Sequence, residues 1–415
     1  MHFDQRERFR MATPAIVSTN SLLETRFKKH SPGATGMLIF ILLLIGGLLY
    51  IGFHLSSDLA VVHSTSVLPF VLLGIALLMA LGFEFVNGFH DTANAVATVI
   101  YTHSLEPTLA VVFSGVMNFA GVLASSGAVA FSIVSLLPVG RSASGSGLPM
   151  IFALLVAAIL WNLTTWWKGL PASSSHTMIG SILGVGVANH LMQGSNSVAG
   201  VDWGQAVKVF RALLWSPIIG FAMAAIIFFL FKILARDHRL YKAPEGTAPP
   251  PLWIRTLLIG TCGGVSFFHG SNDGQKGMGL IMLILVGTVP TAYSLHHIPI
   301  WVKVAVALAL GLGTMIGWKR IVITVGEKIG KTNLTYAQGA SAQITAMITI
   351  WMANNLGLPV STTQVLSSGI AGTMAANGSG LRWTTIRDIA LVWVVTLPAA
   401  ALLSGGLFWV FQRIS

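Results

Sequence analysis

Residues 87–95 read NGFHDTANA and residues 268–277 read FHGSNDGQKG, and both polar stretches lie within long apolar surroundings. Their aspartates are 182 residues apart. Alignment on these aspartates pairs Gly88 with Gly270, His90 with Asn272, Asp91 with Asp273, and Asn94 with Lys276. A carboxylate is costly inside a bilayer, so a duplicated one predicts a site that two related halves share.

A second motif is repeated in the same order. Residues 169–176 read GLPASSSH and residues 357–364 read GLPVSTTQ, and their prolines, Pro171 and Pro359, are 188 residues apart. The similar separations of the two motif pairs indicate an internal repeat rather than chance matches. The inverted arrangement is favoured, because it places a shared site midway across the membrane.

The composition is that of a membrane protein. Hydrophobic residues make up 54% of the 415 residues and charged residues only 9%, whereas soluble domains carry about a quarter charged residues. Apolar runs of near-spanning length recur at 37–54, 67–86, 151–167, 213–233, 302–318 and 389–411. We therefore predict an all-α polytopic membrane protein with about 10–12 transmembrane helices in two inverted repeats, containing re-entrant or broken helices. The alternating segments of a transmembrane barrel are absent.

The net charge of +11 does not indicate nucleic-acid binding, because the basic residues gather in a tail and a linker. Both regions are predicted to face the cytoplasm by the positive-inside rule, which places the N-terminus inside. The basic residues are Arg6, Arg8, Arg10, Arg26, Lys28 and Lys29 in the tail, and Lys232, Arg236, Arg239 and Lys242 around the linker.

The same features divide the chain. We expect a basic arm (1–36), an extra transmembrane helix (37–60), a first repeat (67–234), a proline-rich linker (235–251) and a second repeat (252–415). A signal peptide is the alternative for residues 37–54, but the preceding arm is long for a signal.

The aspartate motifs predict a cation site. Gly88 lies three residues before Asp91, and several glycines surround Asp273, so we expect a helix break near each aspartate. Freed carbonyls and the carboxylate would then form an oxygen cage for a cation or a proton relay. A single motif of this kind could instead be a structural cap in an interfacial loop. This alternative is weaker here, because two such motifs occur at matching positions. Lys276 shares a helical face with Asp273, and its ammonium could fill the space of a sodium ion. Glu84 is a further candidate proton carrier.

The hydroxyl motifs predict an anion site. Serine and threonine cap helix starts, and exposed first-turn amides at such a start attract anions. Two such starts brought together would surround a tetrahedral oxyanion with donors, whereas ordinary capping without a ligand is the alternative. The residues concerned are Ser173, Ser174, Ser175, Ser361, Thr362 and Thr363.

These motifs resemble those of the PiT inorganic phosphate transporter family, in particular its bacterial, proton-coupled, low-affinity members. The resemblance rests on residues 87–102, 169–177, 269–277 and 357–363, and extends from Leu68 to the C-terminus. It implies an inverted-repeat carrier that imports inorganic phosphate across a bacterial inner membrane. By this resemblance Asp91, Asn94, Asn272 and Asp273 serve cation or proton coupling, and the six hydroxyl residues bind phosphate. His90 and Lys276 lie within the same motifs and are added as coupling candidates.

The resemblance also implies the coupling ion and the form of the substrate. Sodium-coupled relatives have asparagine where this chain has His90 and Lys276, which favours a proton over sodium. Bacterial relatives imply transport of a neutral complex of hydrogenphosphate with Mg²⁺, Ca²⁺, Mn²⁺ or Zn²⁺, for which Asp91 and Asp273 are the candidate metal ligands. No resident cofactor is expected. The oligomeric state is open, with a homodimer among the alternatives.

Other functions are less well supported. A sodium-coupled carrier, or a carrier of arsenate or sulfate, would use a similar scaffold, and an ion channel could also have duplicated re-entrant segments. An intramembrane serine hydrolase is disfavoured, since Ser175 and His176 are adjacent and the matching loop has Gln364, which cannot act as a base. We therefore expect a transporter and not an enzyme.

Overall fold

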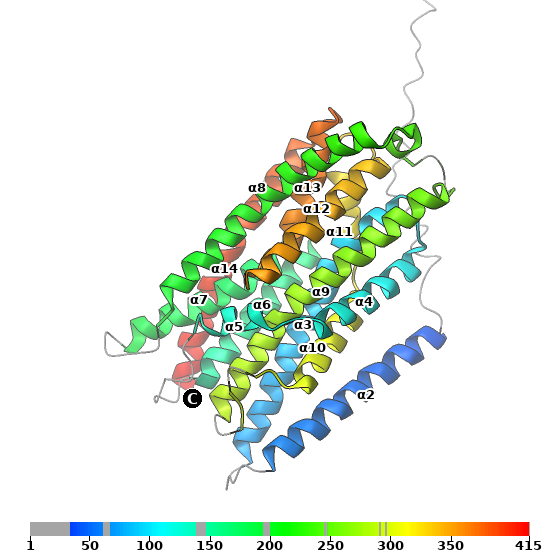
Figure 1. The fold of residues 1–415 in the computed structure, drawn as a ribbon. Coiled ribbons are helices and arrows are strands. Elements are labelled where there is room, and N and C mark those ends of the chain that lie inside the picture. The colour runs from blue at the N-terminus through cyan, green and yellow to red at the C-terminus, as the bar shows by residue number, and fades with distance from the viewer. Residues whose placement is uncertain are drawn as a thin grey trace, which may run out of the picture.

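The computed structural model describes residues 34–60, 67–137, 147–193, 200–244, 246, 248–289, 292–294 and 297–414 (Figure 1). Its elements over these residues are helices, as predicted. They are α2 (Ala34–Leu59), α3 (Leu68–Tyr101), α4 (Pro107–Leu123), α5 (Ala128–Val134), α6 (Gly147–Trp167), α7 (Ser174–Gln193), α8 (Trp203–Leu234), η3 (His238–Tyr241), α9 (Leu252–Thr288), α10 (Ile300–Thr314), α11 (Lys319–Ile323), η4 (Thr324–Lys328), α12 (Tyr336–Asn355), α13 (Thr362–Ala376) and α14 (Trp383–Ile414).

The order of elements repeats. A long helix, a bent pair, a helical hairpin and a second long helix occur as α3, α4–α5, α6–α7 and α8, and recur as α9, α10–α11, α12–α13 and α14. The bent pairs turn by 74° between α4 and α5 and by 59° between α10 and α11. The predicted repeats and broken helices are therefore confirmed.

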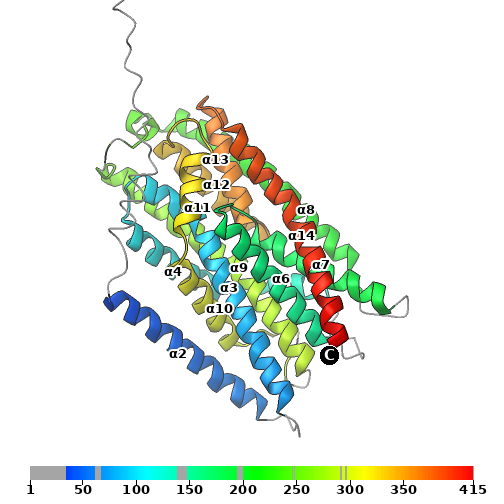
Figure 2. The same ribbon diagram turned by 180° about the vertical axis from the view of Figure 1, so that it is seen from behind.

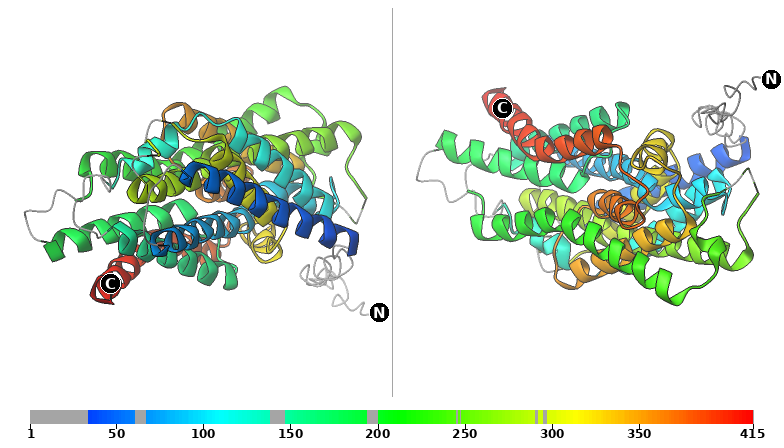
Figure 3. Two further views of the ribbon diagram at one scale, coloured as in Figure 1. Left: turned by 90° about the horizontal axis from the view of Figure 1, so that it is seen from below. Right: turned by 90° about the horizontal axis from the view of Figure 1, so that it is seen from above.

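The two repeats interlock rather than standing side by side. Helix α7 packs on α14 and α13 packs on α8, while α4 packs on α9 and α10 on α3. Figure 2 shows α14 beside α6 and α7, and the views from below and above show helices of the second repeat among those of the first (Figure 3). Each half thus supplies the packing surface for the other, and the hairpins lie inside the bundle.

The two hairpins turn in the same way. Gly169 and Gly357 follow α6 and α12 with φ of +66° and +64°, a conformation that glycine adopts without a steric penalty. The next amide reaches back five residues in each case, from Leu170 N to Thr165 O at 3.0 Å and from Leu358 N to Ala353 O at 2.9 Å. This is the glycine-terminated C-cap, and the prolines that follow prevent helix continuation.

By length and composition, five of the described helices could cross a membrane, or up to seven if each bent pair is one span. Counting each bent pair once, the described chain has eleven helical segments of 15 residues or more, which agrees with the predicted range. The four segments that are not counted as spans are the hairpin helices α7, α12 and α13 and the polar α9. Helix α13 has only 15 residues, whereas α7 and α12 have 20 residues each and are less apolar than the spans.

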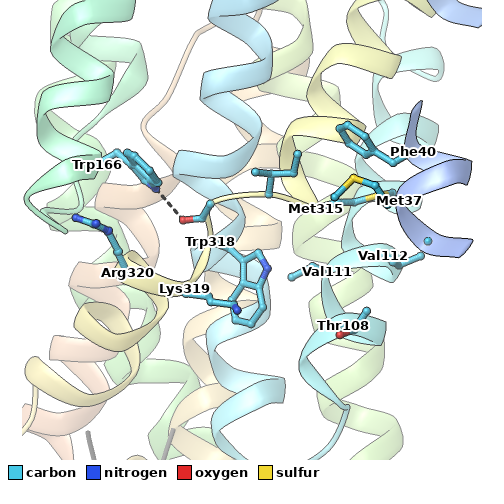
Figure 4. A pocket seen from close by; sticks show the side chains of 13 residues that line it. Met37, Phe40, Thr108, Val111, Val112, Trp166, Met315, Trp318, Lys319 and Arg320 are labelled. Atoms are coloured by element: carbon cyan, nitrogen blue, oxygen red, sulfur yellow. Dashed lines mark hydrogen bonds between the residues drawn. The ribbon is translucent and has the colours of Figure 1, made fainter. Parts of the chain in front are cut away.

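Helix α2 lies at the edge of the bundle, against α10 (Figure 1). Its Gly47 lies beside Leu308, and Asp58 accepts hydrogen bonds from Tyr293 Oη at 2.8 Å and Trp301 Nε1 at 3.0 Å. An apolar cavity lies near the start of α2, where Trp166 Nε1 donates to Gly317 O at 2.7 Å (Figure 4). None of the polar motif residues lines this cavity, so it is a feature of the helix packing and not the candidate site.

Candidate functional site

The four motifs meet in the core of the bundle. Asp91 on α3 accepts a hydrogen bond at Oδ2 from Ser174 Oγ and one at Oδ1 from Thr363 Oγ1, both at 2.7 Å. Ser174 begins α7 and Thr363 lies in the first turn of α13, so one carboxylate joins the tips of both hairpins. Residues 272 positions apart in the chain are in direct contact here.

Both hydroxyl motifs cap helices, as predicted. Ser173 Oγ accepts from His176 N at 3.2 Å, and Ser361 Oγ accepts from Gln364 N at 3.2 Å. The starts of α7 and α13 therefore present matching first turns toward the shared centre, with their positive dipole ends near Asp91. Ser175 Oγ donates to Val360 O at 2.7 Å and links the two tips directly.

A contact between the repeats occurs twice with different chemistry. Asn94 Nδ2 donates to Thr363 Oγ1 at 2.8 Å, and the matching Lys276 Nζ donates to Ser175 Oγ at 2.5 Å. The ammonium also lies 2.6 Å from Asp273 Oδ1 and 3.4 Å from Val360 O. The carboxylate, hydroxyl and carbonyl oxygens around Lys276 are the ligand types that a hard cation takes.

His90 and Asn272, which match each other in sequence, have different surroundings. His90 Nδ1 lies 3.2 Å from Asp91 Oδ1, and its Nε2 lies 3.2 Å from Thr165 Oγ1 at the end of α6. Asn272 holds the other hairpin tip: its Nδ2 donates to Asn354 Oδ1 at 2.7 Å and its Oδ1 accepts from Val360 N at 3.3 Å. In this structure Asn272 positions the α12–α13 turn rather than pointing to the carboxylates.

The predicted helix break at the aspartates is wrong. Helices α3 and α9 are continuous through Asp91 and Asp273. The nearby glycines instead allow close helix packing: a Cβ on Gly88 would lie 2.3 Å from Leu310 O, and one on Gly270 would lie 2.2 Å from Asn118 O. Helix backbone therefore supplies no free carbonyls at the aspartates, and the carbonyl near Lys276 comes from the hairpin tip.

The sequence profile described as the phosphate transporter family matches residues 87–404, which contain all four motifs. This chain belongs to that family.

Curated relatives agree with this assignment. The low-affinity inorganic phosphate transporters PitB and PitA of Escherichia coli (strain K12) are 36% and 37% identical, covering 82% and 81% of this chain and 97% and 96% of their own lengths. A probable low-affinity inorganic phosphate transporter of Bacillus subtilis (strain 168) is 39% identical over 81% of this chain and 96% of its own. A solved structure titled the sodium-dependent phosphate transporter matches with a TM-score of 0.71 at 20% identity, covering 83% of this chain and all of that one, which shows the shared fold.

Sequence reasoning missed two residues of this phosphate transporter family member. Asn87 and His269 lie four residues before Asp91 and Asp273, so each shares a helical face with its aspartate. Asn87 Nδ2 lies 3.5 Å from Asp273 Oδ2, and His269 Nε2 lies 3.5 Å from the same oxygen. The signal was available in the alignment, because Asn87 and His269 also occupy matching positions of the repeat.

Several buried polar atoms in this transporter have no hydrogen-bond partner. Among them are Thr362 Oγ1, Asn94 Oδ1, Asn87 Oδ1 and Glu84 Oε1. Buried polar atoms are almost always hydrogen-bonded, and leaving one unpaired costs about 1–3 kcal/mol. Their gathering around two aspartates and two hydroxyl tips indicates a place for a polar or ionic guest. Glu84 lies next to Asn87 on α3. Its side chain packs closely against Gly277 of α9, where a Cβ would lie 2.3 Å from Glu84 Cγ.

Proposed function

We propose that this phosphate transporter imports inorganic phosphate across a bacterial inner membrane by proton symport, with its N-terminus in the cytoplasm. The substrate form in this proposal is a neutral complex of hydrogenphosphate with a divalent metal ion. The observation that carries it is the pair of hydroxyl contacts on Asp91, one from each hairpin. They join the anion-binding helix starts to a carboxylate that can hold the accompanying cation.

The anion is bound by donors from both repeats. The hydroxyls of Ser173, Ser174 and Ser175 on one tip, and of Ser361, Thr362 and Thr363 on the other, are buried and lie at helix starts, where first-turn amides and the helix dipole favour an oxyanion. When phosphate takes the hydroxyl of Ser174 or Thr363, Asp91 loses a donor. Its free carboxylate then needs a cation, so the two binding events are coupled.

Proton coupling is supported by the charge already present in the site. Lys276 is buried and paired with Asp273 at 2.6 Å, so a covalently attached cation lies where the oxygen ligands could hold a mobile one. In the matching position of the first repeat, Asn94 is neutral. His90, Asp91 and Asn94 there remain for a mobile proton or metal ion, whereas Asn272, Asp273 and Lys276 form the fixed half of the coupling site.

Charge and packing support this membrane orientation. Helices α2 and α9 begin at the same end of the bundle (Figure 1), and each begins directly after a basic segment of the chain, the N-terminal arm or the central linker. Positive segments at one end favour that end as cytoplasmic. An epitope or cysteine placed in the linker and probed from either side of spheroplasts tests this orientation.

The function is tested by radiolabelled phosphate uptake into proteoliposomes of the purified protein, with the pH gradient, sodium and Mg²⁺ varied one at a time. We expect saturable uptake that rises with an inward proton gradient, needs Mg²⁺ and is unchanged when choline replaces sodium. Arsenate is expected to compete and sulfate is not. Uptake that requires sodium without a pH gradient would refute proton symport and support the sodium-coupled alternative.

A further inference from the structure

His269 is held in one orientation by a chain of hydrogen bonds. Thr314 Oγ1 donates to Leu310 O at 2.8 Å and so accepts from Asn118 Nδ2 at 3.2 Å. This fixes the amide of Asn118, whose Oδ1 lies 2.8 Å from His269 Nδ1. Because a carbonyl oxygen accepts, Nδ1 carries the hydrogen, and the remaining nitrogen, Nε2, presents its lone pair in the neutral ring.

That lone pair faces two carboxylates. His269 Nε2 lies 3.5 Å from Asp273 Oδ2 and 3.9 Å from Asp91 Oδ2, and its side chain is only 4% exposed. The Nε2 atom has no hydrogen-bond partner. Three electron-rich atoms directed at one another repel unless a positive charge lies between them. A proton on Nε2 or a bound cation would supply that charge, and the spacing of the three atoms fits the cation.

The spacing suits a metal ion. One oxygen of Asp91, one of Asp273 and a ring nitrogen of His269 all lie within 4.8 Å of one another. Ligands bound at about 2.0–2.4 Å from one ion in tetrahedral or octahedral geometry lie about 2.8–3.9 Å apart, and the distances of 3.5 Å and 3.9 Å from His269 Nε2 to the two carboxylates fall in this range. The carboxylates come from α3 and α9, so the ion would bridge the two repeats.

We propose that Asp91, His269 and Asp273 form a binding site for a divalent transition-metal ion, with His269 Nε2 as the nitrogen ligand. This rests on the proposed function, in which the metal is carried with phosphate, and it names the site of that metal. Asn118 is a positioning residue here, because metal-bound histidines almost always donate their other nitrogen to such a partner.

The nitrogen ligand predicts which metals are favoured. Mg²⁺, Ca²⁺ and Na⁺ take oxygen ligands, whereas imidazole suits Zn²⁺ and the later transition metals. We expect the site to prefer Zn²⁺ to Mg²⁺, and His269 to be the residue that sets this preference. The matching residue in the first repeat is Asn87, whose amide already donates toward Asp273 and Glu84. His90 is the other histidine beside a carboxylate, but its Nδ1 lies against Asp91 Oδ1, whereas His269 faces Asp91 Oδ2.

The decisive measurement is Zn²⁺ K-edge X-ray absorption of the purified full-length protein, without a histidine tag, loaded with one equivalent of Zn²⁺. The wild type is expected to show the outer-shell scattering of a single imidazole ligand. His269→Gln should lose this scattering and bind Zn²⁺ about 100-fold more weakly, because even loss of a ligand's outer-shell partner costs about 10–100-fold. His190→Gln, at the exposed end of α7, is the matched control and should keep both properties.

A transport assay provides a second test of the site. In proteoliposomes supplied with ⁶⁵Zn²⁺ and phosphate, His269→Gln is expected to lower zinc uptake relative to Mg²⁺-supported phosphate uptake by about 10-fold or more. Absence of imidazole scattering in the wild type, or unchanged Zn²⁺ binding by His269→Gln, overturns the site; the latter result would assign the lone pair to a proton. Failure of the wild type to transport phosphate with any metal would instead refute the proposed function, whatever the absorption spectrum shows.

Discussion

Replacing Lys276 with asparagine tests whether its ammonium takes the place of a mobile cation. The substitution copies the matching residue of the first repeat, Asn94, and removes the partner of Asp273, which is 2.6 Å away. Both side chains are completely buried. Breaking a buried ion pair by removing one partner costs about 3–5 kcal/mol, because it leaves an uncompensated charge.

A cation from solution can restore much of this loss. Asp273, Ser175 Oγ and Val360 O remain as oxygen ligands after the substitution. An ion that binds only the folded protein at 100 times its dissociation constant stabilises it by about 2.7 kcal/mol. A site with a dissociation constant of about 1 mM would therefore recover most of the loss in about 100 mM sodium.

The assay is thermal unfolding of the detergent-purified variant in sodium chloride and in choline chloride at equal ionic strength. We expect Lys276→Asn to unfold at a lower temperature than wild type in choline, to recover in sodium, and to acquire sodium dependence in phosphate uptake. Lys208→Asn, on the exposed surface of α8, is the control and should behave as wild type. The reasoning is refuted if Lys276→Asn matches wild type in choline and gains nothing from sodium.

Three further predictions concern the carboxylate, the helix packing and the cap. Asp91→Asn removes the charge that accepts two hydroxyl hydrogen bonds, so phosphate uptake should fall by about 10–100-fold while surface expression, measured by biotinylation, is retained. Gly88→Ala directs a methyl group into Leu310 O, and should lower the free energy of unfolding by about 1–3 kcal/mol; Gly82→Ala, which meets nothing within 4 Å, should not. Ser361→Ala should cost about 1 kcal/mol as a lost cap and raise the KM for phosphate, and an unchanged KM would remove this hydroxyl from the anion site.

The added helix α2 lies outside the part of the chain that matches the family, which begins at residue 87. Its contacts are nevertheless specific, since Asp58 accepts hydrogen bonds from both Tyr293 and Trp301. These bonds tie α2 to the segment that leads into α10, the helix that packs on α3 beside the aspartate motif. Through α10, helix α2 therefore packs indirectly on α3, the helix that carries Asp91.

The sequence determined the class of protein, the duplication and most of the site. Low charge and long apolar runs require a bilayer, because such a chain has too little polar surface for water. The duplicated aspartate and hydroxyl motifs identified most of the site residues. Pairing of Lys276 with Asp273 on one helical face and capping of helix starts by Ser173 and Ser361 could be predicted, because both depend only on local sequence. The matching positions of Asn87 and His269 could also be seen in the sequence, although these two residues were not predicted as part of the site.

Only the tertiary structure decided which residues of the two halves meet. Local sequence does not show that Thr363 and Ser174 donate to the same carboxylate, or that Lys276 reaches Ser175, because these contacts cross between interlocked repeats. It also suggested a broken helix where α3 and α9 are continuous. A glycine that lets a helix unwind and a glycine that lets a neighbouring backbone approach look alike in sequence, and the presence of Leu310 O and Asn118 O beside Gly88 and Gly270 is what separates the two.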